Sequence, residues 1–268
     1  MYPVIFKLGS FTLRTYGVIV LFALLVAWWL ARKEAKEKDY QLQQIDSFIF
    51  LAVTVGVGGA RLYYVLFNLS YYLQNPYQIS MIWDGGLAIH GGLIGGVLAG
   101  IWFCWRNKLR FWRLADTLTP AIILGQAVGR VACFFNGDAY GKPTNLPWGV
   151  TFTHPLSSAP KHISLHPTQL YQLAWNLLVF GVVWSFHRRV KYEGELFLMY
   201  AILYSLGRFF IENLRGDQLI FSFFGLAIST ARTMSVVTIL SVVIFHFILR
   251  KQDRMGKVRI RLNRGIKS

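Results

Sequence analysis

The chain has 268 residues, with 28 Lys and Arg against 12 Asp and Glu, and so a net charge of +16. Hydrophobic residues make up 54% of it and charged residues 15%, whereas a soluble domain carries about 25% charged residues. The apolar content excludes a disordered chain, and the presence of only two cysteines excludes a disulfide scaffold. The positive charge lies in short clusters between apolar runs, which is typical of a polytopic membrane protein and argues against a nucleic-acid-binding protein.

Seven apolar runs approach the length of about 20 residues that a membrane-spanning helix needs. In chain order they lie at residues 16–31, 46–67, 87–105, 114–135, 168–187, 195–212 and 224–249. The first run lacks the basic start and small-residue cleavage site of a signal peptide, so we expect it to be retained. The sequence predicts an all-α integral membrane protein with about seven transmembrane helices, folded as a single polytopic domain over residues 1–268.

The loop charges predict the orientation. Nineteen Lys and Arg lie in the loops after the first, third and fifth runs and in the tail, against five on the opposite side. The positive-inside rule then places the N-terminus outside, in the periplasm or extracellular space, and the C-terminus in the cytoplasm. The basic tail, residues 250–268, either supplies orientation charge alone or also contacts anionic lipid.

Two outer segments are too long to be simple turns. Residues 68–84 are rich in Tyr and Trp, as expected of an arm that lies at the membrane interface. Residues 136–167 form a long outer loop with five prolines, and loops of that length are commonly functional or disordered. No internal repeat is evident, which argues against an inverted-repeat transporter.

Several ionisable residues lie within or at the edge of the apolar runs: Arg61, His90, Arg130, Arg208, Glu212 and Arg232. A charge at the bilayer centre costs about 2.5–3.5 kcal/mol on insertion scales, so each is a functional candidate. The alternative for each is structural pairing or snorkelling, and this alternative is favoured for Arg232. Arg208, Glu212 and Arg215 share a predicted helix face, where Glu212 can neutralise one arginine and leave the other available, unless all three form a structural ion-pair ladder.

A glycine-rich stretch runs from Trp83 to Gly96. Glycines spaced by four allow a neighbouring helix to pack very close. A break at residues 85–92 is also possible and would direct backbone N–H groups at an anion, with His90 beside it as a site residue or as an ordinary core histidine. The fourth run ends in residues 129–138, which contain Arg130, Asn136 and Asp138. Arginines from several helices match the geometry of phosphate and suggest a phospholipid head group.

The order of these motifs resembles the bacterial prolipoprotein diacylglyceryl transferases. The resemblance covers about residues 10–250 and is carried by Tyr16-Gly17, Gly59-Ala60-Arg61, Trp83–Gly96, Gly129–Asp138, His166–Tyr171 and Gly207–Arg215. It implies a multi-pass enzyme of the bacterial cytoplasmic (inner) membrane. Such an enzyme moves the diacylglyceryl group of phosphatidylglycerol to the thiol of the lipobox cysteine of a preprolipoprotein, without metal, cofactor or nucleic acid.

The resemblance also implies roles for individual residues. Arg130 and Arg208 are expected to hold the phosphate, while His90 accepts the thiol proton or else helps to position the head group. The remaining expected substrate-binding residues are Tyr16, Asn136 and Asp138 in the polar pocket, Glu212 orienting Arg208, and Arg61 and Arg215 as secondary, more structural candidates.

Two positions depart from the family pattern: Asp138 stands where a glutamate is common, and Cys133 where an asparagine is common. These departures leave the fine substrate preference open. Two functions of other classes remain as alternatives: a phospholipid or anion transporter that uses the same arginines, and a non-catalytic membrane scaffold.

Overall fold

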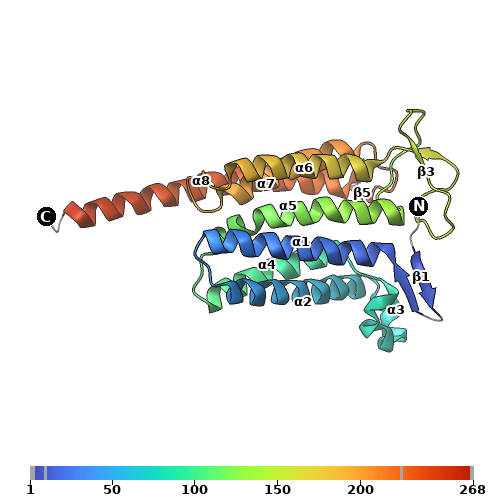
Figure 1. The fold of residues 1–268 in the computed structure, drawn as a ribbon, viewed down its shortest axis with the longest axis horizontal. Helices are drawn as coiled ribbons and strands as arrows, with labels where there is room; N and C mark the ends of the chain where they lie inside the picture. The colour runs from blue at the N-terminus through green and yellow to red at the C-terminus, as the bar shows by residue number, and fades with distance from the viewer. Residues whose placement is uncertain (1–3, 9–10, 224–225, 266–268) are drawn as a thin grey trace. The chain divides into compact units, whose positions relative to one another are not determined.

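The computed structural model describes residues 4–8, 11–223 and 226–265, and helices dominate this part of the chain (Figure 1). The long helices are α1 (Thr15–Glu37), α2 (Leu42–Phe67), α4 (Ile89–Arg106), α5 (Phe111–Asn136), α6 (Thr168–Phe186), α7 (Glu195–Glu212) and α8 (Thr230–Gly265). The shorter elements are helix α3 (Leu69–Gln74), the 3₁₀ turns η1 (Pro76–Ser80) and η2 (Ile82–Asp84), and the antiparallel hairpins β1–β2 (Val4–Leu8, Phe11–Arg14), β3–β4 (Val150–Thr151, Ser164–Leu165) and β5–β6 (Ile220–Phe223, Leu226–Ser229).

Each of the seven predicted apolar runs overlaps one of the long helices. Helices α1, α2 and α5, together with residues 230–255 of α8, are long and apolar enough to cross a membrane by length and composition. Few of the residues in these windows are buried within the chain, so their apolar side chains need a surrounding that is not water. The chain is therefore an α-helical, multi-pass membrane protein.

The last helix differs most from its predicted bounds. Residues 224–225 of the run predicted at 224–249 lie outside the described residues. The next residues, Leu226–Ser229, pair with Ile220–Phe223 as strands, and α8 starts only at Thr230. Short apolar runs fit a strand or a helix equally well, which explains the error. Helix α8 then continues past residue 249 to Gly265, so most of the basic tail is helical.

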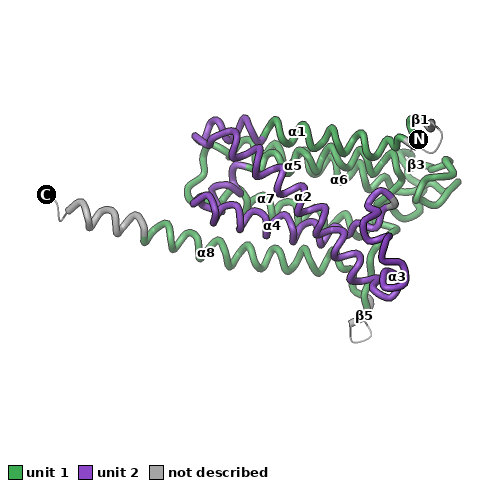
Figure 2. The backbone as a smooth tube through the Cα atoms, turned by 90° about the horizontal axis from the view of Figure 1, so that it is seen from below, with its two compact units in different colours: residues 1–30, 118–268 green, residues 31–117 purple. Residues whose placement is uncertain are grey.

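Two compact units make up the chain, residues 31–117 and residues 1–30 with 118–268, and the boundaries fall within α1 and near the start of α5 (Figure 2). In residues 31–117, helices α2 and α4 pack closely through glycines. A Cβ on Gly91 would overlap the carbonyl oxygen of Gly59, and a Cβ on Gly95 would lie 2.6 Å from the Val55 oxygen. The predicted close packing is confirmed for these glycines.

The other unit holds α6, α7 and α8, which contact one another in sequence order. Helix α7 approaches α6 at Gly207, where any Cβ would overlap the indole ring of Trp175, and the Trp175 Nε1–H donates to the Leu203 carbonyl at 2.9 Å. The segment between α5 and α6 is ordered around the β3–β4 hairpin. Phe152, Ala159 and Leu165 form its small buried core.

Candidate active site

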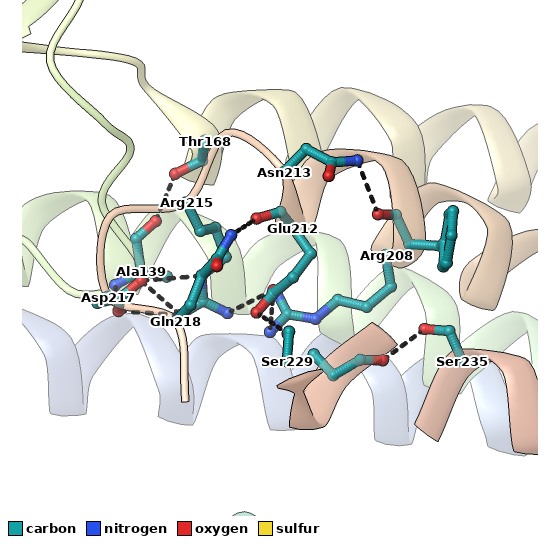
Figure 3. Close-up of polar contacts among 12 residues, drawn as sticks. Ala139, Thr168, Arg208, Glu212, Asn213, Arg215, Asp217, Gln218, Ser229 and Ser235 are labelled. Carbon is teal, nitrogen blue, oxygen red and sulfur yellow. Dashed lines mark hydrogen bonds and ion pairs between the residues drawn. The ribbon is translucent and has the colours of Figure 1, made fainter. Parts of the chain in front are cut away.

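The buried carboxylate of Glu212, at the last residue of α7, organises a cluster of charged and polar groups (Figure 3). Glu212 is 1% exposed, and its Oε2 lies 3.0 Å from the Arg208 Nη2 one helical turn earlier. Its Oε1 accepts a 2.9 Å hydrogen bond from the Ser229 hydroxyl at the end of β6. Because both carboxylate oxygens are held, Glu212 fixes the orientation of Arg208 and compensates its charge.

Arg215 reaches the same carboxylate from beyond the helix end. Because α7 ends at Glu212, Arg215 is not on the helix face where the sequence placed it, yet its Nη1 lies 3.7 Å from Glu212 Oε2. Its closer partner is Asp217, which accepts hydrogen bonds from Nε and Nη2, both at 2.9 Å. Glu212 therefore contacts both arginines and leaves neither without a partner, contrary to the simple division predicted from spacing.

Asp217 was missed by sequence reasoning. The only available signal was an acid placed two residues after an arginine just beyond an apolar run. In the structure the Asp217 carboxylate makes a second contact: its Oδ2 also accepts a 3.0 Å hydrogen bond from the Ala139 backbone N–H. Asp217 thus joins the arginine cluster to the segment that follows α5.

The end of α5 presents the predicted amide and carboxylate together. Gly137 and Ala139 both have positive φ angles, 82° and 56°, which turn the chain sharply after Asn136. The Asn136 Nδ2 donates to Asp138 Oδ2 at 2.5 Å. The two side chains therefore form one polar unit.

Arg130 lies on α5, close enough to interact electrostatically with Arg208 and with Tyr16 at the start of α1. Tyr16 is also within electrostatic range of Asp138 and Cys133. The structure thus brings together Tyr16, Arg130, Asn136, Asp138, Arg208, Glu212 and Arg215. Among the described residues Arg130 forms no hydrogen bond or ion pair, in contrast to Arg208 and Arg215. Its guanidinium is therefore available to an anion.

Arg61 and His90 belong to the unit of residues 31–117. The Arg61 guanidinium is 7% exposed and lies over the Tyr72 ring, with its carbon 5.2 Å from the ring centroid. It donates to five backbone carbonyls, those of Gln78, Ile79, Met81, Gly85 and Gly86. A guanidinium has five N–H groups, so this set leaves no strong donor for a substrate anion and ties Arg61 to the shape of the arm.

His90 lies in the first turn of α4, half-buried, with its ring centroid 6.1 Å from that of Tyr63. The predicted break in the glycine stretch is shorter than expected. Only Gly85 and Gly86, with φ angles of 93° and 71°, precede the helix, whereas Gly91 and Gly92 lie inside it. His90 is consequently at a helix start and not inside an unwound segment.

A cavity of about 510 Å³ lies between the arm and the end of α2. Its lining is polar and aromatic and includes Arg61, Tyr64, Asn68, Tyr71, Tyr72 and Gln78. Outside the cavity, the arm exposes large apolar side chains, among them Leu73, Tyr77 and Trp83. Such a surface is typical of a segment at a membrane–water interface.

The fold and site define a helical membrane protein in which two arginines, Arg208 and Arg215, contact the buried carboxylate of Glu212, and ionisable groups of this kind in a membrane protein mark a functional site. The family model for prolipoprotein diacylglyceryl transferases matches residues 3–248, and the chain belongs to this family.

Three relatives carry the name phosphatidylglycerol–prolipoprotein diacylglyceryl transferase. The protein from Thermotoga maritima is 42% identical over 241 residues, which cover 88% of this chain and 80% of the relative. The protein from Thermosynechococcus vestitus is 41% identical over 218 residues, which cover 80% of this chain and 81% of the relative. The protein from Clostridioides difficile is 38% identical over 251 residues, which cover 94% of this chain and 96% of the relative.

Proposed function

We propose that this chain transfers the diacylglyceryl group of phosphatidylglycerol to the thiol of the lipobox cysteine of a preprolipoprotein. The cysteine sulfur forms a bond to the glyceryl carbon, the bond from that carbon to the phosphate oxygen breaks, and glycerol phosphate leaves. The observation that carries the proposal is membership of the transferase family over residues 3–248. The arginine cluster supplies the chemistry that this reaction needs.

Arg130 and Arg208 are proposed to hold the phosphate. The phosphodiester carries one negative charge, and the departing glycerol phosphate gains about one more as the C–O bond breaks. Donors directed at this growing charge stabilise the transition state more than the ground state. The available guanidinium of Arg130 suits this role, and Glu212 keeps Arg208 in one orientation.

The thiol must lose its proton before or during attack, because the thiolate is the nucleophile. His90 is the proposed acceptor, since a neutral imidazole ring has a nitrogen that can take up a proton. Tyr16, Asn136 and Asp138 are proposed to line the polar pocket around the head group. Arg61 is assigned to holding the arm and Arg215 to holding Asp217, in keeping with their contacts.

The proposed topology has seven spans with the N-terminus outside and the C-terminus in the cytoplasm. The protein would lie as one polytopic domain, residues 1–268, in the bacterial cytoplasmic (inner) membrane. Residues 68–84 would then form an outer interfacial arm, residues 136–167 an outer loop, and residues 250–268 a basic cytoplasmic tail. The exposed aromatic side chains of the arm support this placement.

The test is mass spectrometry of a lipobox peptide incubated with purified protein and phosphatidylglycerol. We expect a mass increase equal to one diacylglyceryl group. Arg130→Ala should lower the rate about 10²- to 10³-fold, as loss of one oxyanion donor does elsewhere. Arg208→Lys keeps a counter-charge for Glu212 but loses the planar fork, and should also be impaired.

Arg106→Ala is the matched control, because Arg106 is an exposed arginine at the end of α4. It should react at the rate of the unmodified protein. Absence of product together with flux of phosphatidylglycerol across liposomes would replace the transferase with the transporter alternative. Arg130→Ala and Arg208→Lys proteins that fold and retain full activity would contradict the assigned roles.

A further inference from the structure

The peptide group of Ala139 is held on both of its polar sides. Its N–H donates to Asp217 Oδ2 at 3.0 Å, and its C=O accepts from the Thr168 hydroxyl at 2.5 Å (Figure 3). Ala139 is 7% exposed and has a φ of 56°, in the left-handed region that a residue with a Cβ avoids. Such a conformation persists when the surroundings determine it strongly.

The preceding carbonyl is held in the same way. Asp138 C=O accepts a 2.8 Å hydrogen bond from Gln169 Nε2, and Gln169 is 0% exposed. Thr168 and Gln169 are the first two residues of α6, so one helix start holds two consecutive carbonyls of this turn. Both side chains are buried, which keeps water from replacing them.

The turn is also tied to the chain that follows α7. The Lys142 N–H donates to the Leu214 carbonyl at 2.8 Å, and the Gly216 N–H donates to the Tyr140 carbonyl at 2.9 Å. Asp217 lies one residue further on and binds Arg215 with the same carboxylate that accepts the Ala139 N–H. The position of Asp138 is thereby set relative to the arginine cluster.

We infer that Thr168, Gln169 and Asp217 are positioning residues for the Asn136–Asp138 pair. They fix the backbone of residues 138 and 139, which directs the Asp138 carboxylate toward Asn136 and keeps it within electrostatic range of Tyr16. The inference rests on the proposed transferase function and adds these three residues to its machinery. None of the three needs to touch the substrate, since they act through Asp138.

The first test removes the Thr168 hydroxyl while keeping the side-chain shape. Thr168→Val should lower kcat/KM for phosphatidylglycerol at least about tenfold, because displacement of a positioned group by about 1 Å can cost up to 10²-fold. Thr168→Ser restores the hydroxyl and should return most of the activity. Thr238→Val is the matched control, because the Thr238 hydroxyl donates to the Met234 carbonyl at 2.7 Å on the exposed side of α8. It should leave the activity unchanged.

A double-mutant cycle with Asp138→Ala separates positioning from general support of the fold. If Thr168 acts through Asp138, Thr168→Val should cost less than about twofold in the Asp138→Ala protein. Gln169→Met, which removes the donor to the Asp138 carbonyl, should follow the same pattern and serves if Thr168→Val folds poorly. Thermal melting in detergent checks that each variant is folded.

Equal losses in both backgrounds, or full activity of both folded variants, would overturn the inference alone. An unmodified protein that gives no thioether product would overturn the proposed function and the inference with it.

Discussion

Glu212 shows how one buried carboxylate can serve two arginines. Its side chain is almost fully buried, and a lone carboxylate there would be costly because it has lost its hydration. Arg208 at 3.0 Å, Arg215 at 3.7 Å and the Ser229 hydroxyl compensate for that loss. These contacts hold Arg208 in one orientation. A solvated arginine would lose side-chain entropy on adopting a single orientation.

We predict that Glu212→Ala lowers the free energy of unfolding by about 3–5 kcal/mol, because removing one partner of a buried ion pair leaves the other uncompensated. Glu212→Gln keeps an acceptor for Ser229 and should cost less. The measurement is the denaturation midpoint in detergent. Asn213→Ala, next in the chain and exposed, is the control and should melt close to the unmodified protein. Equal melting of Glu212→Ala and the control would show that the ion pairs add nothing to stability.

At the scale of elements, the contact between α2 and α4 depends on the absence of side chains at particular positions. Gly59, Gly91 and Gly95 lie where a Cβ would meet the backbone of the facing helix. Small residues are enriched where membrane helices pack this closely, because lipid supplies no hydrophobic force between helices and van der Waals contact must replace it. Not every glycine of the stretch has this role, since Gly96 faces open space.

This difference gives a matched pair on one helix. Gly91→Ala should destabilise the protein by more than the roughly 1–3 kcal/mol typical of overpacking, because its Cβ would overlap backbone that cannot rotate away. Gly96→Ala should be neutral, or stabilising by up to about 1 kcal/mol, since alanine favours the helix. Folded yield and melting temperature of the two variants test this. The prediction fails if Gly91→Ala tolerates heat as well as Gly96→Ala.

The apolar segment after α7 could form either the start of a helix or a strand, and in the structure it forms strands. Residues 220–229 are largely apolar, and the sequence predicts a helix that begins at residue 224. Pairing of β5 with β6 instead brings Ser229 beside Glu212, where its hydroxyl completes the carboxylate's contacts. The hairpin therefore contributes the Ser229 hydroxyl to the arginine cluster. The predicted helix gave no reason to expect this contact.

At the scale of the whole molecule, the distribution of Lys and Arg predicts the orientation in the membrane. We expect a fluorescent protein fused after Ser268 to fold and emit, because the proposed orientation places the C-terminus in the cytoplasm. Alkaline phosphatase inserted near residue 146, in the long loop, should be active because the proposed orientation places that loop outside the membrane. Strong phosphatase activity at the C-terminus would reverse the predicted orientation, and activity at both sites would change the number of spans.

Much of the architecture could be read from the sequence because apolar composition is a local property. The seven apolar runs each overlap a long helix, and most of the residues that carry the family resemblance lie near the ends of these helices or in the turns beside them, whereas Gly59-Ala60-Arg61 lies inside α2. Arg130, Arg208 and Glu212 stood out because charges are rare in such runs. The alternatives for Arg61 could not be resolved from the sequence, since its five carbonyl partners come from a segment 17–25 residues away.

By itself the sequence determined the class of protein, the helical runs, the family and the charged residues worth testing. Hydrophobicity and motif order are properties of the linear sequence and do not depend on tertiary contacts. Only the tertiary structure decided which acid meets which arginine and which groups hold the Ala139 peptide. Asp217 and Ala139 are 78 residues apart, and Thr168 and Ala139 are 29 apart. Such pairings arise from the packing of α6 and of the turn after α7 against the end of α5, and no local pattern of residues encodes them.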